Sequence, residues 1–315
     1  MQVTYSAGLL LINPKTHPTR MPQGNTQVQT AQTTTTQTTE IMREPIGIDV
    51  LDSALEGGVP RGTWVVVTGE PGVGKSILAM HFAWSGLANG EPVIYVTTES
   101  SFRDVVRQGG QFNMRFMDYN PVNLVDALTG RVKVKPGEVN LVVIDLFGLY
   151  RQYREMLKAS EEEGEGKGGR RPSRALSIEV LEASVAKAYE LLGFEEGRPS
   201  EPSRLIIDSM TAFWADKPAM ARAFSYRLRQ ALYRQNITAL LTSQYAPTTE
   251  MSFGFGLEHI ADGIIHMWMD NVTEVKEVRR WLIIKKMRMT NHAKKAYRVD
   301  IQPGKGIELE EYEGE

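Results

Sequence analysis

The sequence predicts an α/β fold in which helices cover both faces of a mainly parallel β-sheet. Two observations lead to this prediction: short apolar runs rich in β-branched residues recur along the chain, and helical or turn-rich stretches separate them. Continuous apolar strands that alternate with helices are typical of a parallel sheet buried on both faces. The predicted strands of this sheet are residues 63–68, 92–96, 141–144, 204–207 and 239–241.

The first predicted strand runs into a match to the pattern G-x-x-x-x-G-K-[ST], and an apolar run at 77–83 then predicts a helix. Glycines let backbone N–H groups turn inward around phosphate oxygens, and the helix N-terminus adds its positive end. In such loops the Lys75 ammonium reaches the β- and γ-phosphates, and the Ser76 hydroxyl ligates Mg²⁺. The strand before the pattern and the helix after it argue against a chance match. The predicted nucleoside triphosphate site comprises Gly69, Glu70, Pro71, Gly72, Val73, Gly74, Lys75 and Ser76.

The remaining elements flank this core. A short helical piece is predicted before the first strand, and three-and-four spacing of apolar residues predicts helices over 176–192 and 219–234. Near the C-terminus, residues 280–284 and 296–301 are predicted to form an antiparallel hairpin.

The chain is predicted to contain one folded domain with a tail and an insertion. Residues 1–43 include a threonine- and glutamine-rich tract that cannot bury a core, so they are predicted to form a disordered tail. The composition changes at Glu44, and the ATPase domain is predicted to span 44–315. Within it, the charged and glycine-rich residues 150–173 are predicted to form a mobile surface insertion.

Composition excludes several classes of protein. A net charge of −2 argues against a constitutive nucleic-acid coat protein, and the absence of cysteine excludes disulfides, thiol catalysis and cysteine-ligated zinc. No run approaches the roughly 18 apolar residues of a membrane span. The apolar residues 7–12 are too short and lack the basic front of a signal peptide. We therefore expect a cytoplasmic protein without membrane insertion.

Two aspartates follow predicted strands and are candidates for organising the metal ion. Asp208 ends the strand 204–207 and is expected to hold Mg²⁺ beside Ser76, while Asp145 ends the strand 141–144 and competes for this role. Asp208 is preferred because the hydroxyl-rich turn 208–211 follows it directly. Helix capping is the alternative for either aspartate.

Two further polar residues are expected at the carboxyl edge of the sheet. Glu99 follows the strand 92–96 through two threonines, so it is expected to polarise the attacking water. A solvated loop carboxylate is the alternative. Gln244 follows the strand 239–241 and is expected to sense the γ-phosphate, although a buried amide bonded to the backbone would fit as well.

From residue 46 to about 309, the chain resembles the KaiC-like branch of the RecA-superfamily ATPases, which includes KaiC and archaeal RadA-related proteins. The resemblance rests on ordered matches at 47–52, 57–62, 69–76, 95–99, 206–209, 261–265 and 286–292.

This resemblance implies a RecA-like P-loop core that uses ATP and Mg²⁺. It also implies a homo-oligomeric ring, expected to be a hexamer, with ATP between subunits. Lys286 and Arg288 match the K-x-R pair that reaches the γ-phosphate of the neighbouring subunit, so they would stabilise the transferring charge in trans. A solvated basic edge is the alternative. His292 falls at a family position near the nucleotide.

Two departures from the family pattern bear on activity. KaiC-type sites carry paired glutamates, whereas Glu99 is followed by Ser100, so catalysis is expected to be slow or independent of the second carboxylate. Glu258 and His259 stand where the autophosphorylating domain has a Ser-Thr pair, so autokinase activity is not expected.

The leading hypothesis is an ATPase that acts as a ring or filament and couples its nucleotide state to a partner, such as single-stranded DNA in recombination or repair. Aromatic and cationic residues after two of the strands suit base stacking, although packing at a subunit interface explains them equally well: Phe213, Trp214, Lys217, Arg222, Tyr245, Phe253 and Phe255. The alternative hypothesis is an ATP-dependent switch or assembly scaffold that hydrolyses slowly and binds protein partners.

Overall fold

The computed structural model describes residues 40–149, 177–213, 221–244, 257–270 and 278–312. The chain divides into two units after Glu40, and all of the elements below belong to the second, Ile41–Glu315. The predicted insertion 150–173 lies outside the described residues.

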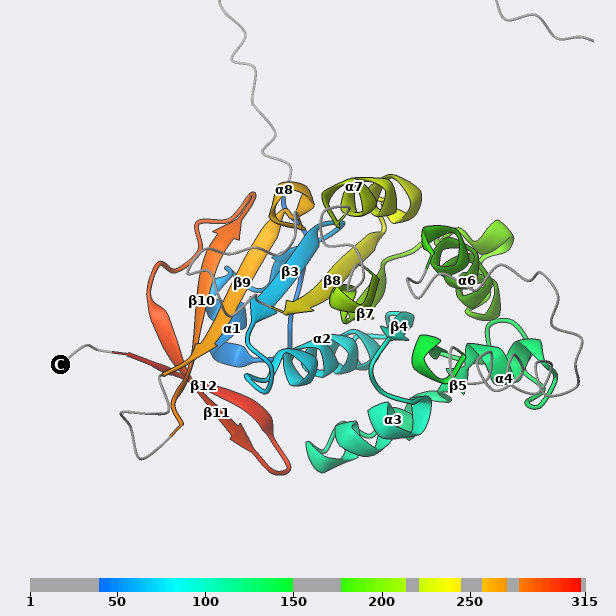
Figure 1. The fold of residues 1–315 in the computed structure, drawn as a ribbon, viewed down its shortest axis with the longest axis horizontal. Coiled ribbons are helices and arrows are strands. Elements are labelled where there is room, and N and C mark those ends of the chain that lie inside the picture. The colour runs from blue at the N-terminus through cyan, green and yellow to red at the C-terminus, as the bar shows by residue number, and fades with distance from the viewer. Residues whose placement is uncertain (1–39, 150–176, 214–220, 245–256, 271–277, 313–315) are drawn as a thin grey trace, which may run out of the picture. The chain divides into compact units, whose positions relative to one another are not determined.

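Within these ranges, ten strands form one sheet in the order β12-β11-β10-β9-β3-β8-β7-β4-β6-β5 (Figure 1). Its strands are β3 (Trp64–Gly69), β4 (Val93–Thr97), β5 (Val122–Asn123), β6 (Leu141–Asp145), β7 (Ser203–Asp208), β8 (Ile237–Gln244), β9 (Gly263–Met269), β10 (Arg280–Met287), β11 (Ala296–Gln302) and β12 (Gly306–Glu311). The short strands β1 (Arg43–Glu44) and β2 (Val59–Pro60) pair separately. The described helices are α1 (Asp49–Ala54), α2 (Lys75–Ala88), α3 (Phe102–Gln111), α4 (Leu124–Leu128), α6 (Ile178–Leu191), α7 (Ala221–Leu232) and α8 (Leu257–Ile260).

The sheet confirms the predicted fold class. The strands from β5 to β9 in spatial order run parallel, while β10, β11 and β12 each run antiparallel to their neighbours. The predicted hairpin is present as β10 and β11. This hairpin is part of a larger antiparallel region of the sheet, in which β9 pairs with β10 and β12 pairs with β11. Strands β9 and β12 were not predicted.

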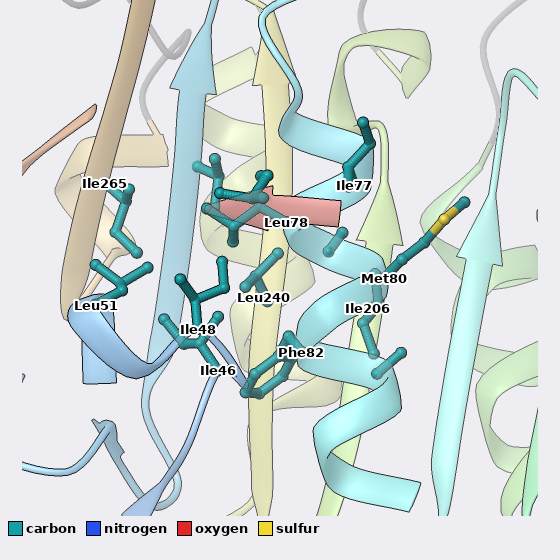
Figure 2. Close-up of a cluster of buried hydrophobic side chains, with 14 of the residues drawn as sticks. Ile46, Ile48, Leu51, Ile77, Leu78, Met80, Phe82, Ile206, Leu240 and Ile265 are labelled. Carbon is teal, nitrogen blue, oxygen red and sulfur yellow. The ribbon is translucent and has the colours of Figure 1, made fainter. Parts of the chain in front are cut away.

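Alternate residues of β3 point into two hydrophobic clusters on opposite faces of the sheet. Val65 and Val67 pack with the side chains of α1, α2 and α3, whereas Trp64 and Val66 pack with those of α6 and α7. Figure 2 shows the first cluster, in which α2 lies across the sheet. Burial on both faces explains why β3 reads as a continuous apolar run.

Arg204 is a fully buried cation that joins β7 to α2 and to the N-terminal segment of the fold. Its guanidinium donates to the Glu91 carboxylate (2.7 Å), to the carbonyls of Pro45 (2.7 Å) and Phe82 (2.8 Å), and to Glu44 (3.4 Å). It also lies 4.5 Å from the centre of the Phe82 ring. These partners offset the cost of burying the charge, and they leave the arginine no room to move.

We expect Gly86→Ala in α2 to destabilise the protein by about 1–3 kcal/mol. Alanine normally favours a helix, but a Cβ at this position would lie 2.4 Å from Cδ of the immobilised Arg204. Gly110→Ala in α3 is the matched control, because no atom lies within 4 Å of its Cβ position, and a gain of about 0.5–1 kcal/mol is expected. Urea unfolding measures both changes. Equal effects of the two substitutions would contradict the packing argument.

His81 of α2 ties the helix to two distant segments. Its Nδ1 donates to the Gly47 carbonyl (3.2 Å), and its Nε2 accepts from the Ile307 N–H of β12 (2.9 Å). These bonds require a neutral ring. Burial lowers the pKa of His81 from 6.5 to about 4.

The buried neutral His81 predicts a loss of stability in acid. The unfolded chain takes up the proton below pH 6.5 and the folded chain only near pH 4. The contribution of neutral His81 to the free energy of unfolding is therefore fully present above pH 6.5. It falls by roughly 3 kcal/mol as the pH drops from 6.5 to about 4. Urea unfolding at pH 7.5 and 4.5 should show a smaller pH effect in His81→Gln than in the unsubstituted protein. An equal pH effect in both would contradict this assignment.

Candidate functional site

The loop between β3 and α2 has the geometry of an anion cradle. The φ of Gly69 is +155°, and a Cβ there would lie 2.3 Å from the Met267 carbonyl oxygen, so only glycine fits. Helix α2 starts after Gly74 without a side-chain cap, whereas Ser101 caps α3 and Ser177 caps α6. The first N–H groups of α2 are therefore available to an anion.

Lys75 is the first residue of α2, and its ammonium folds back onto this loop. Its Nζ donates to the carbonyls of Gly69 (2.9 Å) and Glu70 (2.7 Å). Burial lowers the pKa of Lys75, while the negative charges of Asp208 and Glu99 oppose this shift. A buried cation attracts phosphate oxygens more strongly than an exposed one, because less water screens its charge.

Three hydroxyls converge on the carboxylate of Asp208. Ser76 Oγ (3.2 Å) and Thr242 Oγ1 (2.6 Å) donate to its Oδ1, and the Tyr95 hydroxyl donates to its Oδ2 (3.0 Å). Burial, reinforced by the charge of Asp208, raises the pKa of Tyr95, so this phenol remains a donor. Asp208 and Ser76 are thus side by side at the carboxyl edge of the sheet.

Asp145, the competing candidate, lies elsewhere and serves as a backbone cap. Its carboxylate accepts from the N–H groups of Phe102 (2.9 Å) and Gly148 (2.6 Å). It does not line the cleft that contains Lys75 and Asp208. These contacts agree with the alternative that Asp145 caps a helix, because Phe102 is the first residue of α3.

Glu99 and Gln244 share a cleft of about 300 Å³ with the phosphate loop. The Glu99 side chain is exposed, and its Oε1 accepts from the Ser209 hydroxyl (3.0 Å). The Gln244 N–H donates to Thr211 Oγ1 (3.0 Å). The cleft is lined by Pro71, Gly72, Gly74, Lys75, Ser76, Ile77, Glu99, Gln108, Asp208, Ser209, Thr242 and Gln244.

Among the residues of this site that sequence reasoning missed are Tyr95, Thr242 and Gln108. Tyr95 is hidden inside an apolar run, and only the parallel register of β4 beside β7 brings its hydroxyl to Asp208. Thr242 carried a usable signal, since it is a hydroxyl residue near the carboxyl end of a predicted strand. Gln108 lies on α3, whose position in space the sequence does not reveal.

Lys286 and Arg288 lie level with the amino end of β3, whereas the phosphate loop of their own chain follows the carboxyl end of this strand. Met287 of β10 pairs with Gly263 of β9, which pairs in turn with Val65 near the start of β3, whereas the phosphate loop begins at Gly69. Four strand residues, about 13 Å, separate these two levels. The pair therefore cannot reach the cleft of its own chain.

The contacts of this basic pair are local. Lys286 Nζ donates to the Ala261 carbonyl (2.7 Å), and burial, reinforced by the charge of Arg288, lowers the pKa of Lys286. The mostly exposed Arg288 donates to Oδ1 of the buried Asp262 (3.0 Å). His292 follows on the same side, where its Nδ1 donates to the Ala293 carbonyl (2.9 Å). It is not brought to its own chain's phosphate loop.

The residues proposed to stack on nucleic-acid bases are only partly described. Phe213 is 2% exposed and packs against Phe224, with 5.3 Å between ring centres, so the prediction that it stacks on bases is wrong. Arg222 is exposed. The others lie outside the described residues: Trp214, Lys217, Tyr245, Phe253 and Phe255.

The described residues lack two features that would point to a membrane or to a protein-ligated metal centre. None of their helices combines the length and apolar character needed to cross a membrane. Nor do they contain a group of three or more His, Cys, Asp or Glu side chains arranged to hold a metal ion.

Comparisons with known proteins agree on one family. The family model described as "ATPase: KaiC" matches residues 44–158 and 178–314. A UPF0273 protein of Thermotoga maritima is 31% identical over 277 residues, which cover 87% of this chain and 98% of that protein. A UPF0273 protein of Pyrococcus furiosus is 32% identical over 270 residues, with coverages of 85% and 93%.

The fold is also found in a solved structure. The crystal structure of a KaiC-like protein from Pyrococcus horikoshii OT3 aligns with a TM-score of 0.61 at 24% identity, and the alignment covers 86% of this chain and all of that one. At this identity the likeness shows the fold alone. Together with the family match, it confirms the RecA-type P-loop fold and the resemblance drawn from the motifs. The chain belongs to the KaiC family of ATPases.

Proposed function

We propose that this protein hydrolyses ATP in an Mg²⁺-dependent reaction at the cleft between the phosphate loop and the carboxyl ends of β4, β7 and β8. The observation that carries the proposal is the meeting of Lys75, Ser76, Asp208 and Glu99 around one cleft of about 300 Å³. These residues supply a phosphate-binding cation, a metal-ligating hydroxyl, a metal-organising acid and a water-polarising carboxylate.

The residues of the cleft fit ATP and Mg²⁺. Gly72 leaves an open backbone turn, since no atom lies within 4 Å of its Cβ position. Ser76 and Asp208 offer oxygen ligands, which Mg²⁺ prefers, and a few protein ligands are enough because the nucleotide phosphates supply others. When bound, Mg²⁺ neutralises phosphate charge.

The proposed mechanism assigns a separate task to each polar group. Glu99 accepts a hydrogen bond from the attacking water and orients it toward the γ-phosphate. Lys75 balances the negative charge of the phosphate oxygens as water bonds to the γ-phosphorus and the bond from this phosphorus to the ADP oxygen breaks. Tyr95 and Thr242 hold Asp208 in a fixed orientation beside Ser76. Gln244 contacts the γ-phosphate from the end of β8.

We propose that the site is completed by a second copy of the chain in a ring or filament, with a hexameric ring expected. The support is the position of Lys286 and Arg288 at the edge opposite their own phosphate loop. Head-to-tail packing of identical subunits brings these two edges together. Lys286 and Arg288 then face the neighbour's γ-phosphate, and His292 lies beside its nucleotide.

Two versions of the biological role follow. In the first, ATP turnover drives a macromolecular partner, for which single-stranded DNA is the candidate; this choice rests on the sequence pattern alone. In the second, the protein is a slowly hydrolysing switch or assembly scaffold for protein partners. The second is favoured by Ser100, which stands where a second carboxylate would be and is bonded through its backbone to Thr97 Oγ1.

Steady-state phosphate release with ATP tests the proposal, with Mg²⁺ or EDTA and with or without single-stranded DNA. Mg²⁺-dependent turnover is expected, and its absence together with undetectable ATP binding would contradict the proposal. Stimulation by DNA would support the motor version. Tight ATP binding with negligible turnover under all conditions would support the switch.

A further inference from the structure

The Glu99 carboxylate is held at one oxygen although its side chain is exposed to the cleft. The Ser209 hydroxyl donates to Glu99 Oε1 at 3.0 Å. A glutamate in solvent samples many rotamers, and fixing it costs conformational entropy. A hydrogen bond from a rigid donor therefore restricts the positions that the Glu99 carboxylate can take.

Ser209 is such a rigid donor. It is 4% exposed, and Thr98 Oγ1 accepts from its N–H (2.9 Å) and donates to its carbonyl (3.1 Å). The Ser209 hydroxyl also accepts from the Thr211 N–H (3.2 Å). A serine hydroxyl has one proton, so this arrangement directs that proton to Glu99.

The hydrogen-bonded chain continues to the end of β8. Thr211 Oγ1 accepts from the Gln244 N–H at 3.0 Å, and the Gln244 residue lines the same cleft as Glu99. Glu99, Ser209, Thr211 and Gln244 thus form one connected series. The carboxylate of Asp208, the proposed metal-organising acid, is held by a different set of hydrogen bonds, from Ser76, Thr242 and Tyr95.

We propose that Ser209 and Thr211 are positioning residues that aim the Glu99 carboxylate at the attacking water and link its position to Gln244. The inference rests on the proposed ATPase function and adds a device to it. Contact of Gln244 with the γ-phosphate fixes the position of the end of β8. The hydrogen bonds through Thr211 and Ser209 then fix the position of the Glu99 carboxylate. ATP is then hydrolysed only when its terminal phosphate is seated.

Ser209→Ala is expected to lower kcat by about 10- to 100-fold, since small displacements of a catalytic group have effects of this size. The KM for Mg²⁺-ATP should change by less than about twofold, because Lys75, Ser76 and Asp208 keep their contacts. Thr211→Val removes the acceptor for Gln244 and should lower kcat by a smaller factor. Thr211→Ser keeps the hydroxyl and should restore kcat.

A double-mutant cycle separates positioning from structural damage. Single-turnover hydrolysis is measured for Ser209→Ala alone, for Glu99→Ala alone and for the double variant. If Ser209 acts through Glu99, adding Ser209→Ala to Glu99→Ala should change the residual rate by less than about twofold. An equal loss of rate in both backgrounds, or an unchanged kcat in Ser209→Ala, would overturn the inference.

The same data keep this inference apart from the proposed function. Turnover that disappears in Glu99→Ala while Ser209→Ala behaves like the unsubstituted protein would remove the positioning role and leave the ATPase intact. No turnover in the unsubstituted protein would instead overturn the positioning role, and undetectable ATP binding in the same protein would overturn the proposed function as well.

Discussion

Glu99→Gln is expected to lower ATP turnover by about 10²- to 10⁴-fold, the range lost with a general base. Glutamine has nearly the same shape and still accepts from the Ser209 hydroxyl, which lies 3.0 Å from Glu99 Oε1. It lacks the negative charge that polarises water. ATP binding should persist, because the phosphate contacts of Lys75 and Ser76 are untouched. Phosphate release and binding of a fluorescent ATP analogue measure the two quantities.

Glu138→Gln provides the matched control for Glu99→Gln. Its side chain is 59% exposed and lies outside the cleft, so its turnover should equal that of the unsubstituted protein. If Glu99→Gln retained more than about a tenth of the turnover, the water-polarising role would have to pass to another group, and Gln108 would be the first to examine.

Arg288→Ala is expected to lower turnover by about 10³-fold or more, as the loss of an arginine that stabilises transferring phosphoryl charge does. The residue touches no part of its own chain's cleft, so the affinity of that cleft for Mg²⁺-ATP should change little if the arginine acts mainly on the transition state. The measurement is phosphate release at saturating ATP, with oligomer mass recorded for the same samples.

Lys285→Ala is the control for Arg288→Ala, since Lys285 is an exposed cation on β10, the strand that Arg288 directly follows. It should leave turnover unchanged. Equal losses in the two variants would point to a general electrostatic effect of the basic edge, and normal turnover in Arg288→Ala would exclude the finger role.

The structure confirms the predicted strand, loop and helix around residues 69–76, and this arrangement was predictable because every part of its signal is local. The pattern at 69–76 lies between a strand and a helix in the chain itself, so no long-range contact is needed to read it. The helices over 178–191 and 221–232 were likewise visible from their spacing. Strands β9 and β12 were missed because β9 includes His266, and β12 alternates only two apolar residues with acids.

What could not be predicted depends on sheet order and direction. Asp208 and Asp145 both end apolar strands, and only the order β3-β8-β7-β4-β6 puts one of them beside Ser76 and the other two strands further away. Lys286 lies near the end of β10 and Arg288 directly follows it, and the antiparallel direction of this strand carries both residues away from their own phosphate loop. The resemblance suggested a trans role, and the topology supplies a physical reason for it.

Completion of the site by a second subunit is the central claim, and mixing two inactive variants tests it most directly. Lys75→Ala lacks the phosphate-binding cation but keeps Arg288, while Arg288→Ala has the reverse defect. When the two are co-expressed and purified together, about a quarter of the interfaces in a randomly mixed ring combine both intact halves. We predict phosphate release well above the sum of the separate variants. Release no greater than that sum, from oligomers shown to contain both chains, would contradict the claim.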